Sequence, residues 1–126
     1  TELASSNRIA LLLSSNSQNR LMLYNRGGGV GGFVEIDDVI YPFPDVLPSQ
    51  SGYVRLAVSL IDGNTRLYAN SIDLGAVSQQ NPAIANYSTI NIGSAGSSAF
   101  IDGTIKSIKY TPKAVSDTQL QELSTL

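Results

Sequence analysis

Short segments in which apolar and polar residues alternate recur along this chain, with turn sequences between them. The clearest example is YVRLAVSLI, residues 53–61, whose inward face is predicted to hold Val54, Leu56, Val58 and Leu60. Successive side chains on a strand point to opposite faces of a sheet, so this period of two predicts a strand with one buried face. The DGN sequence that follows predicts a tight hairpin to TRLYA, residues 65–69.

The same pattern predicts further strands. RIALLLS, residues 8–14, is expected to form a hairpin with RLMLYN, residues 20–25, and Ile9, Leu11 and Leu13 are expected to share one face of the first strand. Other predicted strands are residues 33–41, 72–75, 89–93 and 100–110, the last with Ile105, Ile108 and Tyr110 completing the sandwich. About eight short strands, with a turn signal about every ten residues, are typical of an antiparallel β-sandwich or jelly roll. The predicted fold class is therefore all-β.

Glycine and proline mark the connections. RGGGVGG, residues 26–32, has no GK[ST] ending and no helix pattern after it, so a bulged connection is favoured over a phosphate-binding loop. YPFPDVLPSQSG, residues 41–52, contains prolines that cannot donate to a ladder, which predicts a surface loop or an irregular edge. Asn70-Ser71 predicts a second small turn.

One short helix is predicted at the end of the chain. Ser116 followed by Gln119 is a capping box, and Val115 before the cap can meet Leu120 as a hydrophobic staple. Leu120 and Leu123 lie three residues apart, so they form one apolar stripe that is expected to dock on the sandwich.

The composition restricts the chemistry. The 126 residues include no Cys and no His, which excludes thiol nucleophiles, Cys/His metal sites and Ser-His-Asp triads. A net charge of -2 gives no basic stripe for nucleic acid, and no apolar run is long enough to span a bilayer. We therefore expect neither nucleic-acid binding nor membrane insertion. Residues 1–126 are expected to form a single domain, and the start at Thr1 suggests excision from a larger protein.

A family resemblance is carried by four phrases: RLAVSLI, RLYANSIDLG, INIGS and FIDGTIKSIKYTPKAVSDTQLQEL. Their order resembles that of the concanavalin A-like lectin and laminin G-like sandwich domains, in particular those of bacteriophage tail fibres, tailspikes and other virion proteins. The resemblance covers residues 53–123 well and residues 8–37 loosely. Asn70-Ser71 stands where the family usually has Asn-Gly, Thr111 replaces a second Tyr, and the Trp common in sugar sites is absent.

The resemblance implies a concanavalin A-like jelly roll on a virion surface, in an extracellular setting. It also implies a non-catalytic module that recognises host cell-surface polysaccharide. Such phrases identify a fold more specifically than they identify a ligand.

The strongest enzymatic signal is VEIDDVI, residues 34–40. Laminarinase-like hydrolases on this fold carry a Glu-x-Asp-x-Glu strand, and Glu35 and Asp37 occupy its first two positions on one expected face. The second Glu is missing, because position 39 is Val. A retaining glycosidase needs both a nucleophile and an acid, so we expect the chain not to be an enzyme.

A candidate ligand surface consists of outward-facing arginines and tyrosines. If the strands pair as predicted, one sheet surface would hold Arg20, Tyr24, Arg55, Arg66 and Tyr68. Tyrosine rings stack on sugars and guanidinium groups bind hydroxyls or carboxylates, which suits an acidic polysaccharide. The same face could instead pack against a neighbouring subunit or domain, or simply face solvent.

Calcium is a further possibility, since hard cations take oxygen ligands. The candidate ligands are Asp37, Asp38, Asp62 and Asp102. There is no dense acidic loop, and an Asp-Gly pair is more often a turn, so no cofactor is required.

Two functional hypotheses remain. The first is a carbohydrate-binding module of a virion that recognises host polysaccharide without cleaving it. The second is a structural module without a sugar ligand, which forms a homotrimer or binds other virion proteins.

Overall fold

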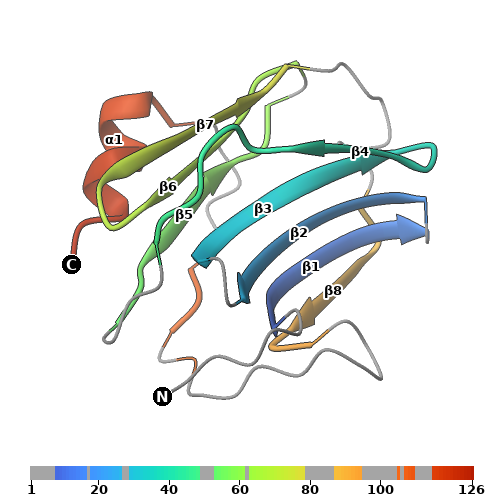
Figure 1. Ribbon diagram of the computed structural model, residues 1–126, viewed down its shortest axis with the longest axis horizontal. Coiled ribbons are helices and arrows are strands. Elements are labelled where there is room, and N and C mark those ends of the chain that lie inside the picture. The colour runs from blue at the N-terminus through green and yellow to red at the C-terminus, as the bar shows by residue number, and fades with distance from the viewer. Residues whose placement is uncertain are drawn as a thin grey trace.

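The computed structural model describes residues 8–16, 18–26, 29–48, 53–61, 63–78, 87–94, 105, 107–109 and 115–126. Within these residues, eight strands form two antiparallel sheets, and one short helix lies near the C-terminus (Figure 1). The predicted all-β sandwich with a single C-terminal helix is confirmed.

The larger sheet has five strands in the order β4-β3-β2-β1-β8. They are β1 (Arg8–Asn16), β2 (Asn19–Arg26), β3 (Gly29–Ile36), β4 (Val39–Pro42) and β8 (Thr89–Ile92). The smaller sheet has the order β5-β6-β7. Its strands are β5 (Leu56–Ser59), β6 (Thr65–Ala69) and β7 (Ile72–Val77). Helix α1 (Asp117–Leu123) packs against β5 and β6, on the side away from β2 and β3 in Figure 1.

The main core lies between the two sheets. Its buried members are Leu21, Leu23, Val30, Val34, Phe43, Leu47, Leu67, Ala69, Leu74 and Val77. The alternation predicted for β2 and β6 places their inward leucines here. A second cluster of Leu12, Met22 and Tyr24, with Phe33 packed against it, lies on the opposite parity of the larger sheet. Both faces of this sheet are therefore partly buried.

Two tight turns use non-glycine residues in the left-handed region. Asp37 and Asp38 have φ values of 48° and 67°, and Asn70 and Ser71 have φ values of 49° and 70°. Two successive positive φ values are typical of type I′ hairpin turns, for which Asn and Asp are the most tolerant L-residues. The predicted turn at Asn70-Ser71 is confirmed. The predicted single strand over residues 33–41 is wrong, because Asp37 and Asp38 divide it into β3 and β4.

The glycine run was predicted to be a bulged connection, but residues 29–32 belong to β3. A Cβ atom on Gly32 would lie 2.6 Å from the carbonyl oxygen of Met22, so the close approach of the backbones requires glycine there. The described part of the proline segment follows the edge of β3. Leu47 and Val30 exchange backbone hydrogen bonds of 2.9 and 2.8 Å. This segment is therefore an irregular edge that places Phe43 and Leu47 in the core.

Three predictions for apolar residues are wrong. Leu60 lies beyond the end of β5 and is 40% exposed. Ile108, expected in a strand over residues 100–110, is 51% exposed, and residues 105 and 107–109 are not in a strand. The other residues of that predicted strand lie outside the described residues. Leu123 is 43% exposed, whereas Leu120 is 2% exposed, so only one of the two helix leucines docks.

The predicted capping box is confirmed. Gln119 N donates to Ser116 Oγ at 3.2 Å, and Ser116 N donates to Gln119 Oε1 at 3.0 Å. These bonds satisfy amide groups at a helix end that have no partner within the helix, which allows so short a helix to begin at this residue.

Replacing Leu67 by Ala should lower the free energy of unfolding by about 2–5 kcal/mol, because it leaves a cavity between the sheets. Leu67 is fully buried. Leu60→Ala is the matched control, and it should change the unfolding free energy by less than about 1 kcal/mol, since that side chain is exposed. Urea denaturation of both variants measures the difference. Equal losses would mean that the core has been assigned incorrectly.

Alkaline pH should destabilise the fold through Tyr87, which packs against the main core. Burial raises the pKa of Tyr87 from 10.0 to about 12. Above pH 10 the unfolded tyrosine ionises while the folded one stays neutral, so the unfolding free energy should fall as pH rises towards 12. Urea denaturation between these pH values should show a flatter dependence for Tyr87→Phe. An unchanged dependence in Tyr87→Phe would contradict the assignment of this effect to Tyr87.

Candidate functional site

The five predicted ligand residues do not lie on one sheet surface. Arg20 and Tyr24 belong to β2 in the larger sheet, whereas Arg66 and Tyr68 belong to β6 in the smaller one, and Arg55 precedes β5. On each strand these residues have the parity opposite to the core leucines. They therefore occupy the outer faces of two different sheets, and the predicted continuous surface is wrong.

Neither predicted tyrosine offers an exposed ring. Tyr24 is 4% exposed, and Tyr68 is 7% exposed. Burial raises the pKa of Tyr68, and the negative charges of Asp73 and Asp117 raise it further, while Arg66 partly opposes the shift. Both tyrosines therefore serve as packing residues in this conformation.

Arg20 is held by a carboxylate rather than presented to solvent. Its Nε donates to Glu35 Oε2 at 2.7 Å, and its Nη2 forms an ion pair with the same oxygen. The two residues are direct cross-strand partners on β2 and β3. Glu35 is only 6% exposed, so the guanidinium group compensates the cost of burying this carboxylate.

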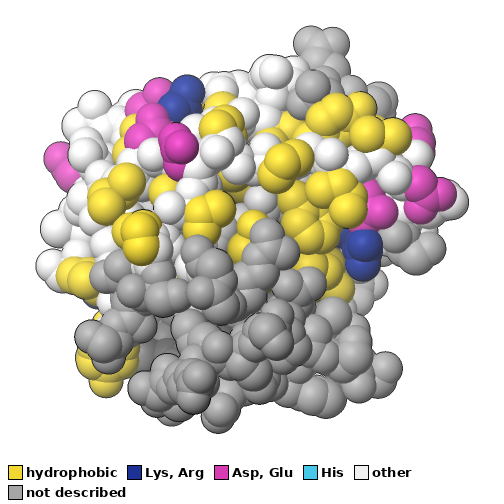
Figure 2. All heavy atoms as spheres, in the orientation of Figure 1, with side chains coloured by type: hydrophobic (Ala, Val, Ile, Leu, Met, Phe, Trp, Pro, Cys, Tyr) yellow, Lys and Arg dark blue, Asp and Glu magenta, His cyan; other side chains and the backbone are white. Residues whose placement is uncertain are grey.

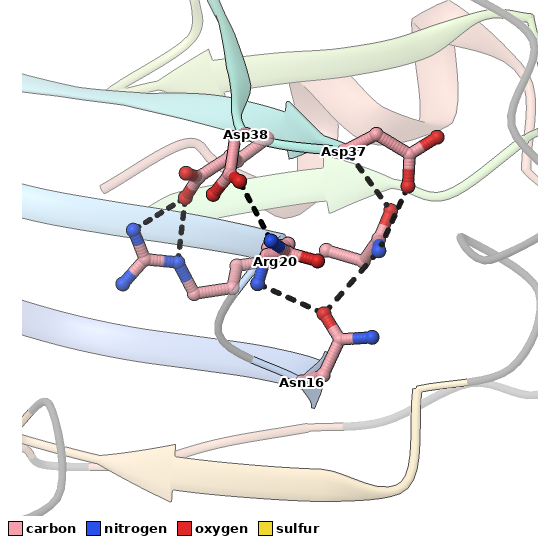
Figure 3. A network of polar contacts seen from close by, with 7 residues as sticks. Asn16, Arg20, Asp37 and Asp38 are labelled. Atoms are coloured by element: carbon pink, nitrogen blue, oxygen red, sulfur yellow. Dashed lines mark hydrogen bonds and ion pairs between the residues drawn. The ribbon is translucent and has the colours of Figure 1, made fainter.

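A polar network lies beside this ion pair, where the β1–β2 and β3–β4 hairpins turn (Figure 3). We name Asn16, Gln18, Asn19, Asp37 and Asp38 the hairpin-end cluster. Gln18 Nε2 donates to Asp38 Oδ2 at 2.6 Å, and Asn19 Nδ2 donates to Asp37 Oδ1 at 3.3 Å and to Asn16 Oδ1 at 3.2 Å. Asp37 N donates to Asn19 Oδ1 at 3.3 Å. These bonds connect two turns that are far apart in sequence.

The hairpin-end cluster keeps unused hydrogen-bonding groups at the surface. Asn16, Gln18, Asp37 and Asp38 are exposed, and only Asn19 is buried. In Figure 3 the amide nitrogen of Asn16 points away from the network, and it has no hydrogen-bond partner among the described residues. The cluster therefore offers both donors and acceptors to a ligand.

The described residues contain no group of three or more His, Cys, Asp or Glu that could hold a metal ion. The carboxylates of Asp37 and Asp38 instead accept hydrogen bonds from Asn19 and Gln18. The other two calcium candidates, Asp62 and Asp102, lie outside the described residues.

Glu35 and Asp37 do not share a strand face as the enzymatic pattern predicted. Glu35 is the penultimate residue of β3 and is paired with Arg20, whereas Asp37 begins the turn with a positive φ. Because of the turn, Glu35 and Asp37 do not lie side by side on one strand face, as their spacing in the sequence suggested.

The other two arginines contact helix α1 or the residues after it. Arg66 Nη1 forms an ion pair with Asp73 Oδ2 at 2.5 Å, and Arg66 Nε lies 3.6 Å from Asp117 Oδ1. Arg55 Nη1 donates to the carbonyl oxygen of Thr125 at 2.7 Å. Arg55 therefore fastens the residues after the helix to the smaller sheet, whereas Arg66 joins β6 to β7 and lies beside the first turn of α1.

Sequence reasoning did not identify Asn16, Gln18, Asn19 and Asp73 as interacting residues. For the residues between the two strands of the first hairpin, the sequence pattern predicted nothing beyond the connection itself. The available signal was the arrangement of the hairpins, since antiparallel order places the β1–β2 turn at the same end of the sheet as the β3–β4 turn.

Apolar side chains are exposed near both edges of the larger sheet. Val39 and Ile40 on β4 are 50% and 54% exposed, and Ile90 and Ile92 on β8 are 54% and 49% exposed. Figure 2 shows hydrophobic side chains over β3 and β4, with acidic side chains at the end where that hairpin turns. Within the described residues, no helix is long and apolar enough to cross a membrane.

Comparison with known proteins supports the fold and nothing finer. No family model matches the chain, and no curated protein matches it. Among solved structures, it is similar to residues 221–444 of an S-layer domain-containing protein from Clostridium thermocellum, with a TM-score of 0.50 and 16% identity. The match covers 97% of this chain and 64% of that chain. At this identity the likeness concerns the arrangement of strands alone.

Removing the positive charge of Arg20 should destabilise the larger sheet. Arg20→Leu leaves the Glu35 carboxylate buried without its partner and should lower the unfolding free energy by about 1–3 kcal/mol. Arg20→Leu combined with Glu35→Leu should recover most of the loss, because no buried charge then remains. Denaturation of the two variants checks this, and additive losses in the double variant would contradict a direct coupling.

Proposed function

We propose that this chain is a non-catalytic carbohydrate-binding module of a virion protein, such as a tail fibre, spike or decoration protein. In this proposal it recognises a glycan on the host surface. The hairpin-end cluster is the observation that carries the proposal. Its exposed carboxamide and carboxylate groups provide donors and acceptors within one small area. Sugar hydroxyl groups both donate and accept hydrogen bonds, so these are suitable partners.

The charges of the cluster favour a neutral glycan. Arg20 is neutralised by Glu35, while Asp37 and Asp38 remain exposed on the same end of the molecule. Their negative charges would repel an acidic polysaccharide. The acidic ligand that the arginines suggested is therefore not the one that this site would select.

The virion assignment depends on the resemblance of residues 53–123 to phage sandwich domains. The non-catalytic assignment depends on the environment of Glu35. A glycosidase needs one carboxyl group as acid and a second as nucleophile or base. Here Glu35 is engaged by Arg20, and Asp37 takes part in the turn. In this proposal the carboxylates hold the sugar and leave its glycosidic bonds intact.

A second candidate function is assembly, as a structural module that forms a homotrimer or binds other virion proteins. The exposed side chains of Val39, Ile40, Ile90 and Ile92 favour it. Apolar residues at sheet edges are suited to burial against another protein.

The proposed ligand class can be tested on an array of bacterial polysaccharides. The wild-type chain should bind at least one neutral glycan, and Gln18→Ala combined with Asp38→Ala should lower the affinity by about tenfold or more, which corresponds to about 1.4 kcal/mol. Glu122→Ala is the control. It removes an exposed carboxylate from α1, on the side of the molecule away from the β3–β4 turn in Figure 1, and should leave binding unchanged.

Silence over the whole array would reject glycan binding. If the same preparation sedimented as a trimer at high concentration, the assembly function would be favoured instead. Loss of binding in the α1 control would place the glycan away from the hairpin-end cluster.

A further inference from the structure

Helix α1 covers the outer face of the smaller sheet with very little buried apolar surface. It packs on β5 and β6, where the outward residues include Arg66 and Tyr68. Leu120 is the one buried residue of the helix, whereas Leu123 is 43% exposed. A single leucine contributes only a small part of the burial that stabilises a domain, so the helix is attached more weakly than any core strand.

The other attachments of the helix are polar and lie near its C-terminal end. Arg55 Nη1 donates to Thr125 O at 2.7 Å, and the hydroxyl groups of Ser71 and Thr125 are 2.7 Å apart. Gln121 Nε2 donates to Ser71 O at 3.0 Å, and Ser71 N donates to Ser124 Oγ at 3.1 Å. All but the last of these bonds are exposed, so water can replace them when the helix leaves.

Near its N-terminal end the helix leaves a buried donor unsatisfied. Arg66 Nε is buried and has no hydrogen-bond partner within the part of the chain that the structure describes. Its nearest recorded acidic oxygen is Asp117 Oδ1, at 3.6 Å, which is too far for a hydrogen bond. The closed form therefore brings an acidic oxygen close to this guanidinium group without completing the contact.

We propose that α1 is a cap that opens independently of the sandwich, and that the surface formed by Arg66 and Tyr68, together with the exposed Arg55 beside it, binds a carboxylate-bearing sugar. In the closed form two oxygens from the C-terminal segment face the arginines that the ligand would use. Thr125 O accepts from Arg55, and Asp117 Oδ1 lies beside Arg66.

The chemistry of these groups selects the ligand. Guanidinium groups bind carboxylates with charge-assisted hydrogen bonds. Arg66 Nη1 is held by Asp73 of β7, but Arg66 Nε is a donor without an acceptor among the described residues. Uncovering Tyr68 would add an aromatic surface on which a sugar ring can stack. A uronic acid unit provides both the ring and the carboxylate. This site lies on the smaller sheet, whereas the hairpin-end cluster lies on the larger one. It is also suited to a negatively charged sugar, whereas the cluster is suited to a neutral one.

Native-state hydrogen exchange tests the opening of the cap in the wild-type chain. The amides of Leu120 and Ser124 donate to Ser116 O and Leu120 O within the C-terminal segment. They should exchange at least about a hundredfold faster than the amides of Leu21 and Leu23, which lie in the central part of the larger sheet. If the amides of both groups exchanged at the same rate, through global unfolding, the proposal would be overturned.

Binding is tested with oligogalacturonate, and neutral maltooligosaccharides serve as the comparison. Leu120→Asp should open the cap and bind oligogalacturonate at least about tenfold more tightly than wild type. Leu123→Asp, at an exposed position of the same helix, is the control and should bind like wild type. In the Leu120→Asp background, Arg66→Gln should abolish the gain, whereas Asp38→Ala should leave it intact.

Tyrosine ionisation gives an independent readout. Tyr68 should ionise at lower pH in Leu120→Asp than in the wild-type chain, because opening removes the burial and the Asp117 charge that raise the pKa of Tyr68. The signal of Tyr68 is identified as the one that is lost in Tyr68→Phe. An open variant that binds polyglutamate but not oligogalacturonate would overturn the assignment to a sugar. If Leu120→Asp fails to fold, the exchange rates of the wild-type chain still decide whether the cap opens.

Discussion

The contact between the inner faces of the two sheets determines the position of almost every other residue. Leu21 and Val34 on one side pack in the same cluster as Leu67 and Leu74 on the other. Burial of such a side chain contributes about 1.5–3 kcal/mol. This energy determines which set of alternate side chains on each strand faces the core. Because a strand has only two faces, that choice also directs Arg20 and Glu35 outward on one sheet, and Arg66 and Asp73 outward on the other.

The tight turns determine which residues of neighbouring strands lie next to one another. A two-residue turn at Asp37 and Asp38 fixes the register of β3 and β4, and it also places two carboxylates at one end of the sheet. The β1–β2 turn reaches the same end, where Gln18 and Asn19 donate to those carboxylates. Asp37 and Asp38, which adopt left-handed backbone conformations, are thus also the residues whose carboxylates accept these hydrogen bonds at the surface. Stability of the hairpins and chemistry of the surface therefore depend on one short sequence.

The alternating pattern predicted the sandwich, the first hairpin, the β5–β6–β7 meander and the capped helix, because these depend on interactions between near neighbours in sequence. It did not predict that Asp37 and Asp38 would divide a strand, since neither is glycine and the apolar pattern continues across them. Tyr24 and Tyr68 were assigned to an exposed surface because the alternating pattern shows on which face of a strand a residue lies. The pattern does not show whether another part of the chain covers that face. Their burial depends on residues distant in sequence, as the packing of α1 on the sheet that carries Tyr68 illustrates. For the same reason, the pairing of Arg66 with Asp73 and Asp117 could not be obtained from strand periodicity alone.

The contacts of the described arginines limit where an anionic ligand could bind. Arg20 is occupied by the Glu35 carboxylate, which is buried and would be costly to leave unpaired, so Arg20 serves to stabilise the sheet. Arg55 and Arg66 differ, because oxygens on or beside α1 face them, and that helix has a single buried residue. The contact of Arg55 with Thr125 can be exchanged for another at the cost of moving one helix, whereas Arg66 Nη1 keeps its ion pair with Asp73 on β7. The neutral ligand proposed for the hairpin ends would need no such movement, since the donors and acceptors there are already exposed. The two proposals thus assign to one sandwich a preformed polar site and a cationic site that is available only when the helix is displaced.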